Sequence, residues 1–487
     1  MQQLQSTEAA PIWSFFEKIC EIPHPSKHEQ ALSDWITNWA TSKGISCIQD
    51  TIGNLILKKT ASIGFESKTP VILQCHLDMV PQKNADKIHD FLVDPITLVI
   101  DENEEWLRAD GTTLGADNGV GMASCLAILD DDNIEHGPIE VLITTDEETG
   151  MTGAFGLEAG MLEGKILINT DSEQEGELYV GCAGGINVNV LLPYEKMEPD
   201  TEDRAYEISI SGLRGGHSGV DINLGRANAI EELAIVLSNL DAAPFLISSF
   251  TGGSLRNAIP REASAIIVCA EEYKNSLEML VNTLQVSLNK KYKDAENIVS
   301  LNIKPCALPS SVLTNSSHNN LLAALLGCSN GVYAMDGNFS DVVETSSNFG
   351  VIKQQCDPQN QFSIQILVRS QVEKDKQERA TLIAKHFEKF GARVTKEGNY
   401  PGWTPNKDSA IYQTMENQYK TLFNKKPKSM VIHAGLECGL FSDKYPNWDM
   451  ISFGPTINFP HSPDEKVEIE SVDKYWALLK ATLKAID

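Results

Sequence analysis

The segment VILQCHLDMVP, residues 71–81, places a histidine and an aspartate directly after a run of mostly apolar residues. One residue separates His76 from Asp78, so in an extended chain both side chains point to the same side. Imidazole nitrogens and carboxylate oxygens bind divalent metal ions and also exchange protons. A single histidine at a strand end is more often a hydrogen-bonded structural residue, so this segment alone does not define a site.

Four further segments carry the same kinds of side chain at comparable places. Each follows an apolar run expected to form a strand, or begins the helix that comes after one. They are Asp117 in TTLGADNGVGMA, Asp146, Glu147 and Glu148 in VLITTDEETG, Asp171 in ILINTDSE, and His461 in ISFGPTINFPHSPDE. Because an open α/β sheet binds ligands at the carboxyl ends of its strands, these side chains are predicted to meet at one site.

None of these residues is informative by itself. A run such as Asp-Glu-Glu is expected about once by chance in a chain with 67 acidic residues among 487. Asp117 has an ordinary alternative role as the N-cap of a helix, and Asp171 could simply end its strand. Their shared position at strand ends is what favours a metal site over coincidence.

Two imidazoles with three carboxylates suit two Zn²⁺-like ions, each with nitrogen and oxygen ligands and a free position for water. One carboxylate must bridge such a pair, and Asp117, central in chain order, is the candidate. In the adjacent pair Glu147 and Glu148, one carboxylate can bind metal while the other acts as a general base. Asp78 is placed to accept the second ring N–H of His76.

Alternating strand and helix patterns up to about residue 186 predict an α/β domain with a central mixed sheet. The pattern then changes, and residues 206–400 are typical of an α+β domain made of two similar halves. A further apolar strand and a closing helix at 471–485 return to the first type. We therefore expect one α/β domain formed by residues 1–186 and 401–487, interrupted by an inserted domain at 187–400.

The composition narrows the class of protein. A formal net charge of −27 argues against nucleic acid or an anionic membrane as a partner. No stretch approaches the ~18 unbroken apolar residues of a membrane helix, and the N-terminus lacks the pattern of a signal peptide. Ten cysteines without regular spacing indicate reduced thiols. A cytoplasmic enzyme is expected.

As a set, HLDMV, GADNGVGMA, TTDEETGMTGA, NTDSE and HSPDE resemble, in order, the signature segments of the aminoacylase and carboxypeptidase G superfamily of co-catalytic zinc metallopeptidases. With the inserted domain, the resemblance covers essentially the whole chain. It implies a zinc-exopeptidase-like catalytic domain and a lid. CHLDMVPQKN, GLRGGHSG and HAGLECG are similar to the branch of that superfamily that hydrolyses Xaa-His dipeptides.

The resemblance also implies roles for individual residues. One metal ion is expected on His76 and Asp171, the other on Glu148 and His461, with Asp117 bridging both and followed by a cis peptide bond. Glu147 becomes the general base and Asp78 the support of His76. In the lid, the expected substrate-binding residues are His217, which helps to stabilise the oxyanion, Asn257 and Arg369, and Gly435, which lies after the lid, is expected in the substrate pocket.

The predicted function is hydrolysis of dipeptides, with a preference for Xaa-His dipeptides such as β-alanyl-histidine, by water activated between two divalent ions. Zn²⁺ is expected, and Co²⁺ or Mn²⁺ also suit nitrogen and oxygen ligands. An N-acyl amino acid amidohydrolase on the same scaffold and a metal-holding, catalytically inactive binding protein are the alternatives. The lid either replaces a dimer contact of shorter relatives or itself forms a homodimer, and the sequence leaves both open.

Overall fold

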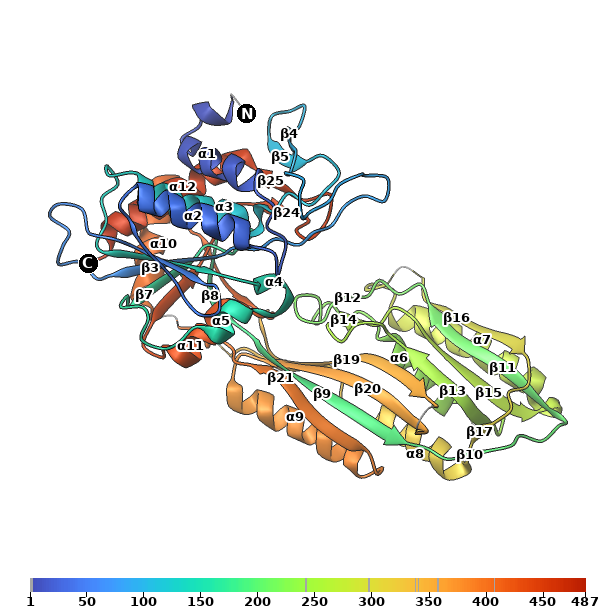
Figure 1. Ribbon diagram of the computed structural model, residues 1–487. Coiled ribbons are helices and arrows are strands. Elements are labelled where there is room, and N and C mark those ends of the chain that lie inside the picture. The colour runs from blue at the N-terminus through green and yellow to red at the C-terminus, as the bar shows by residue number, and fades with distance from the viewer. Residues whose placement is uncertain are drawn as a thin grey trace. The chain divides into compact units, whose positions relative to one another are not determined.

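The computed structural model describes residues 3–240, 243–296, 298–337, 339, 341–356, 359–406 and 408–487. Internal contacts divide the chain into two compact units, coloured along the chain in Figure 1. Unit 1 comprises Met1–Gly181, Trp403–Val431 and Leu436–Asp487, and unit 2 comprises Cys182–Gly402 and Ile432–Gly435. The division falls at 181 and 402, where the sequence suggested 186 and 400. The brief return of the chain to unit 2 at 432–435 was not expected.

Unit 1 is built on an eight-stranded mixed sheet in the order β1-β2-β6-β3-β7-β23-β8-β22. Its central strands β6, β3, β7 and β23 run parallel, while β1, β2 and β8 pair antiparallel. Every residue of β3 and β6 is buried, as expected of strands covered on both faces. The strands are β1 (Ser46–Gln49), β2 (Leu55–Lys59), β3 (Val71–His76), β6 (Ile139–Thr144), β7 (Ile166–Asn169), β8 (Glu177–Cys182), β22 (Lys428–Ile432) and β23 (Asp449–Ser452).

The two faces of this sheet have different chemistry. Leu73 and Cys75 of β3 belong to the main hydrophobic core together with residues of α1, α3 and α12. Gln74 and His76 alternate with them and point to the opposite face. The helices of unit 1 are η1 (Leu4–Ser6), α1 (Ala10–Cys20), α2 (Gln30–Ser42), α3 (Ala116–Asp130), α4 (Glu147–Gly150), α5 (Thr152–Gly156), α10 (Ala410–Phe423), α11 (Glu437–Lys444) and α12 (Ile469–Ala485).

A second, smaller sheet in unit 1 has the order β24-β25-β5-β4. Its strands are β4 (Leu98–Ile100), β5 (Trp106–Ala109), β24 (Ile457–Asn458) and β25 (Lys466–Glu468). β25 pairs antiparallel with β5. This pairing brings the loop after β24, which contains His461, next to the segment that leads from β5 to α3.

Unit 2 has a nine-stranded sheet: eight strands follow the order β16-β11-β15-β13-β19-β20-β9-β21, and β18 pairs with β19. Two-stranded pairs β10–β17 and β12–β14 accompany it. The strands are β9 (Gly184–Pro193), β10 (Lys196–Met197), β11 (Asp203–Ser211), β12 (Gly216–His217), β13 (Leu246–Gly252), β14 (Ala258–Ile259), β15 (Ala263–Ala270), β16 (Ser300–Cys306), β17 (Val312–Leu313), β18 (Gly331–Met335), β19 (Val343–Gln355), β20 (Gln361–Ser370) and β21 (Arg393–Tyr400).

The two similar halves expected in the inserted domain are present, and they share one sheet. β11-α6-β13-β15-α7-β16 and β9-α8-β19-β20-α9-β21 are both β-α-β-β-α-β units of the ferredoxin-like type. In each, the order of strands across the sheet is fourth, first, third, second. The halves meet where β13 pairs with β19. Because β9 precedes the whole first half, the first half is inserted into the second.

The helices of unit 2 are α6 (Ala229–Ser238), η2 (Glu271–Tyr273), α7 (Lys274–Lys291), α8 (Asn315–Leu326) and α9 (Glu373–Glu388). Asn228 and Thr314 cap α6 and α8 by accepting first-turn N–H groups, as their residue types favour. Apolar side chains of these helices and of the sheet form a hydrophobic core of their own. Among the described residues of the whole chain, no helix combines the length and apolar character required to cross a bilayer.

Candidate active site

The first group of metal-competent atoms in unit 1 joins His76, Asp117 and Asp171. His76 ends β3, Asp171 follows β7, and Asp117 lies in the first turn of α3, so the parallel strands bring together residues far apart in the chain. His76 Nε2 is 3.1 Å from Asp117 Oδ1 and 3.3 Å from Asp171 Oδ1. A cis peptide bond joins Asp117 to Asn118, as the resemblance implies.

The second group joins Asp117, Glu148 and His461. His461 Nε2 is 3.1 Å from Asp117 Oδ2 and 3.0 Å from Glu148 Oε2. Asp117 therefore directs one carboxylate oxygen to each histidine. This is the arrangement required of a carboxylate that bridges two ions, and all five predicted ligands lie in these two groups.

The donor atoms fit two divalent cations. Each group contains one imidazole nitrogen and carboxylate oxygens, a ligand set suited to Zn²⁺ and similar ions. Among the described residues, Glu148 Oε1 is buried without a hydrogen-bond partner, and the buried Asp171 Oδ1 has only the His76 Nε2 atom nearby, at 3.3 Å. Within the described part of the chain, no lysine or arginine forms an ion pair with the carboxylates gathered here, Asp78, Asp117, Glu147, Glu148 and Asp171. Buried carboxylates in such excess require compensating positive charge.

The pKa values of the site without metal ions point to the same requirement for positive charge. Burial raises the pKa of Asp171 to about 7. Hydrogen bonds with Asp117 and Glu148 raise the pKa of His461 to about 11. Burial disfavours a charged His76, yet the nearby carboxylates of Asp171, Asp117 and Asp78 raise its pKa well above the ordinary value. Protons thus neutralise part of the charge that metal ions would neutralise, and metal binding should release them.

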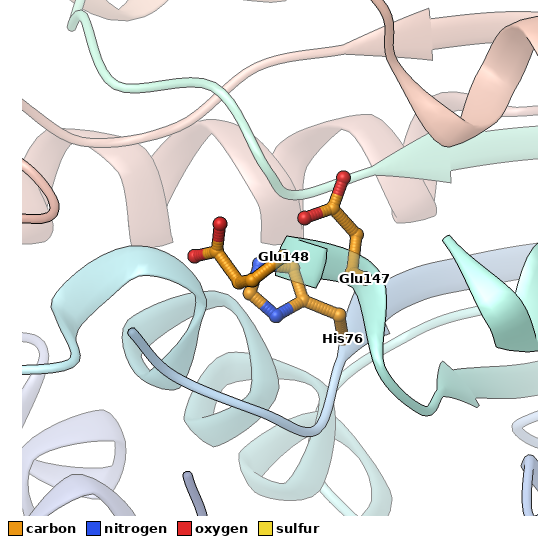
Figure 2. A group of neighbouring side chains, drawn as sticks. All are labelled: His76, Glu147 and Glu148. Atoms are coloured by element: carbon orange, nitrogen blue, oxygen red, sulfur yellow. The ribbon is translucent and has the colours of Figure 1, made fainter. Parts of the chain in front are cut away.

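Glu147 and Glu148 are neighbours at the start of α4, but their carboxylates have different surroundings. Figure 2 shows both side chains beside the His76 ring. Glu148 forms an ion pair with His461, whereas no ion pair joins Glu147 to either histidine among the described residues. The carboxylate of Glu147 nevertheless lies close enough to His76 and Glu148 to form a third group of metal-competent atoms with them. Burial raises the pKa of Glu147 well above its ordinary value. A carboxyl group with high proton affinity next to the ligands is suited to proton transfer.

Asp78 supports this centre in a different way from that expected. The Nδ1 atom of His76 lies 2.9 Å from the backbone carbonyl oxygen of Asp78, and the nearer carboxylate oxygen is 3.5 Å away. A carbonyl oxygen can only accept, so Nδ1 carries the ring proton and Nε2 is left for metal. The Asp78 carboxylate instead accepts the backbone N–H groups of Glu147 and Glu148 and the hydroxyl of Ser26.

A layer of buried polar side chains lies below His76 on the same face of the sheet. Gln74 and Thr144 donate to Glu437 Oε2 at 2.6 and 2.7 Å, and Asn169 donates to Gln74. Glu437 is fully buried at the start of α11, and its burial raises its pKa to about 8. The layer connects β6, β3 and β7 directly beneath the ligands and so fixes the ends of these strands.

In unit 2, Arg369 and His217 form a second cluster. Arg369 is 4% exposed, and it donates to the Tyr400 hydroxyl at 2.9 Å. In the described part of the chain no Asp or Glu forms an ion pair with it. His217 Nδ1 accepts the N–H groups of Gly219 and Val220, which leaves the ring proton on Nε2, 3.3 Å from Arg369 Nη2. Arg369 Nε also donates to the Ser218 hydroxyl at 3.4 Å, which leaves Arg369 Nη2 and His217 Nε2 as two donors that face each other without an acceptor among the described residues. Such a pair of donors is typical of an anion-binding site.

The return segment 432–435 completes this cluster. His433 Nε2 contacts the Ser346 hydroxyl at 2.7 Å, and its buried Nδ1 has no hydrogen-bond partner among the described residues. Burial and then Arg369 lower the pKa of His433 to about 3 and that of His217 to about 4, so both rings are neutral near pH 7. Asn257 is exposed in the turn before β14, and its carbonyl accepts the Ser218 N–H. Gly435 ends the return segment and is half-buried.

Sequence reasoning missed four residues that hold these two clusters: Ser26, His433, Glu437 and Glu465. His433 and Glu437 stand in the segment HAGLECG and Glu465 stands in HSPDE, both noted in the sequence for other residues. The contacts of Ser26 and Glu465 go largely to backbone groups or to supporting carboxylates, which no spacing of residue types reveals. Glu437 was signalled only as an acidic residue in an otherwise apolar segment.

The fold and the two ligand groups define a metallopeptidase of known type. The profile of Peptidase family M20/M25/M40 matches residues 72–485, and the chain belongs to this family.

Two relatives resemble the chain over its full length. It is 45% identical over 487 residues to the cytosol non-specific dipeptidase of Escherichia coli (strain K12), with 100% of this chain and 99% of that protein covered. The crystal structure of aminoacylhistidine dipeptidase from Vibrio alginolyticus matches with a TM-score of 0.91 and 46% identity, over 99% of this chain and 98% of that one. Aminopeptidase PepT from Bacillus cereus shares the fold, with a TM-score of 0.58 and 16% identity over 98% of this chain and 99% of that one.

Proposed function

We propose that this protein is a metal-dependent dipeptidase of the cytosol whose substrates include Xaa-His dipeptides. The observation that carries the proposal is the pair of ligand groups that share Asp117, with Glu147 beside them. The names of the full-length relatives from Escherichia coli and Vibrio alginolyticus supply the substrate class and the location. The names of these relatives do not favour the alternative of an N-acyl amino acid amidohydrolase. We retain a homodimer as a prediction.

Five residues would hold two divalent ions. His76 and Asp171 would bind one, Glu148 and His461 the other, and Asp117 would bind both through its two oxygens. Bound there, Zn²⁺, Co²⁺ or Mn²⁺ would polarise the scissile carbonyl group and lower the pKa of a water molecule. The protonated Nδ1 of His76, held by the carbonyl of Asp78, keeps Nε2 available as a ligand atom.

Glu147 acts as the general base in this proposal. Its backbone N–H is bound by the Asp78 carboxylate at 2.9 Å, so its position is fixed independently of any ion. Its carboxylate would take a proton from the attacking water and return it to the leaving amine. Glu148, whose N–H also binds Asp78, faces His461 and remains a ligand. The adjacent glutamates thereby divide base and ligand roles between them.

The cluster in unit 2 would bind the anionic parts of the substrate. Arg369 offers a buried guanidinium group with no acidic partner in the described part of the chain, and a planar guanidinium matches a terminal carboxylate. His217 is neutral with its proton on Nε2, which suits a donor to a developing oxyanion. Asn257 and Gly435 remain predicted contacts of the substrate.

The Glu147→Gln variant tests the proposal, with Glu158→Gln, an exposed glutamate, as control. Wild type and the control should hydrolyse β-alanyl-histidine and other dipeptides but not N-acetyl amino acids. The Glu147→Gln protein should contain the same amount of metal while kcat falls about 10²- to 10⁴-fold, because a general base contributes that much. A wild-type kcat in the Glu147→Gln variant would show that Glu147 is not the general base. A wild-type protein that cleaves only N-acyl amino acids would contradict the dipeptidase assignment.

A further inference from the structure

Glu465 makes an unusual set of contacts four residues after His461. Its two carboxylate oxygens accept hydrogen bonds from four consecutive backbone N–H groups. Oε2 accepts from Leu114 at 2.7 Å and Gly115 at 2.9 Å, and Oε1 accepts from Ala116 at 2.8 Å and Asp117 at 3.3 Å. Glu465 is 2% exposed, and among the described residues no lysine or arginine pairs with it.

These N–H groups belong to the segment that leads into α3 and not to a regular turn of helix. Ala116 and Asp117 open α3, but the backbone of Asp117 and Asn118 departs from helical φ and ψ, and the first N–H groups of a helix lack intrahelical partners. The N-cap residue is Gly115, with φ of 72° and no side chain to act as a cap. Glu465 therefore does from another part of the chain what a capping side chain does locally.

We propose that Glu465 is a positioning residue that fixes the backbone of Asp117 so that its two oxygens can serve both metal ions. The inference rests on the proposed role of Asp117 as the shared ligand. Four N–H donors require a group that only accepts, which a carboxylate provides and an amide does not. Residues with such supporting contacts determine the orientation of metal ligands without touching the metal.

The same loop meets Asp117 twice. His461 Nε2 approaches the carboxylate of Asp117 at 3.1 Å, and Glu465 binds its backbone. The loop is itself held by the pairing of β25 with β5 and by a hydrogen bond from the Glu465 N–H to the Ser462 carbonyl. Glu465 thereby sets the distance between His461 and Asp117 before any ion binds.

The first test measures amide hydrogen exchange in the full chain after removal of metal. Exchange is followed at pH 8, because burial raises the pKa of Glu465 to about 7. In Glu465→Gln the amides of residues 114–117 should exchange about tenfold faster or more, since the new amide group faces two of the four donors. The control is Glu140→Gln, in unit 1. Glu140 Oε2 accepts both the Glu163 and Gly164 N–H groups, and Oε1 pairs with Lys58 at 2.8 Å. The variant loses this ion pair but keeps the two N–H contacts, and it should leave residues 114–117 unchanged. Unchanged exchange in Glu465→Gln overturns the inference.

A second measurement needs only the wild-type protein, and it tests the proposal even if Glu465→Gln does not fold. In the wild-type protein, the amides of residues 114–117 should exchange more slowly than those of the first turn of α9, which has no side-chain cap. Equal rates would overturn the proposal without any substitution.

The third measurement is metal content and kinetics. Glu465→Gln should bind less metal and lose about 10- to 100-fold in kcat/KM, the usual effect of removing a supporting contact, while Glu140→Gln keeps wild-type values. Faster exchange with unchanged metal content would overturn the positioning role. If the wild-type protein cleaves no dipeptide but Glu465→Gln still alters exchange and metal content, the proposed function fails and this inference stands.

Discussion

Replacing Asp78 by asparagine tests how the metal centre is held in place. The Asp78 carboxylate accepts the Glu147 N–H on Oδ1, and the Glu148 N–H and the Ser26 hydroxyl on Oδ2. An asparagine can keep both contacts at Oδ2 only by directing its NH₂ group at the Glu147 N–H. The variant therefore loses one charge-assisted hydrogen bond in a fully buried position and gains a contact between two donors.

The expected loss of stability follows from the protonation of Asp78. Desolvation opposes ionisation, yet contact with His76, Ser26 and the Glu147 N–H lowers the pKa of Asp78 from 3.8 to about 2. At 1.36 kcal/mol per pH unit, the native interactions of the carboxylate contribute about 2 kcal/mol. Because the folded pKa is the lower one, this contribution is present above about pH 4 and is lost as the pH falls towards 2.

Urea unfolding of metal-free protein measures the effect. Asp78→Asn should be about 2 kcal/mol less stable than wild type at pH 6, and about half of that difference should have disappeared at pH 3. Asp86→Asn, at an exposed carboxylate, is the control and should match wild type at both pH values. With metal restored, kcat/KM of Asp78→Asn should fall about 10- to 100-fold. If the two proteins differed in stability by the same amount at pH 6 and pH 3, the reasoning would be refuted. Such a result would mean that the charge of the Asp78 carboxylate does not contribute to stability.

Two further predictions concern the return segment and the metal ions. In Gly219→Ala the new Cβ would lie 2.0 Å from the His433 carbonyl oxygen, so we expect a loss of about 1–3 kcal/mol of stability and a raised KM. Gly337→Ala, whose new Cβ would have no atom of the described residues within 4 Å, should behave as wild type in thermal unfolding and kinetics. Dialysis against a chelator should abolish dipeptide hydrolysis and lower Tm. Zn²⁺, Co²⁺ or Mn²⁺ at 100 times the Kd of each site should then restore about 2.7 kcal/mol of stability for each bound ion. Metal analysis should then find two ions per chain, and a single ion would contradict the sharing of Asp117.

That the candidate metal ligands lie close together could be predicted from the sequence, because short segments of it specify the strands that position them. His76, Asp171 and Glu148 follow apolar strands, and the carboxyl ends of parallel strands converge whatever the length of chain between them. The insertion was visible for a similar reason, since the strand patterns before residue 186 and after residue 400 have the same character. The predictable parts of the fold and the site were therefore the segments whose own residues specify their structure.

The remaining features depend on long-range contacts that leave no local pattern. Glu465 binds backbone N–H groups about 350 residues earlier in the chain, and any residue type can donate a backbone N–H. The Asp78 carboxylate was assigned to the His76 ring because a two-residue spacing makes that contact possible, but the carbonyl of Asp78 takes that position. Likewise, the two halves of unit 2 join through the pairing of Gly252 with Ile352, which the sequence of neither strand predicts.

The nesting of one half of unit 2 inside the other has a consequence during synthesis. β9 (Gly184–Pro193) pairs with β20 (Gln361–Ser370) and with β21 (Arg393–Tyr400), both made about 170 or more residues later. At a translation rate of about 5–20 residues per second, β9 waits for roughly 10 to 30 seconds with both edges unpaired, while the inserted half can already complete its four strands. An unpaired strand of alternating buried residues invites association with other chains, so the nascent protein should be most prone to aggregation after β9 emerges and before β20 does.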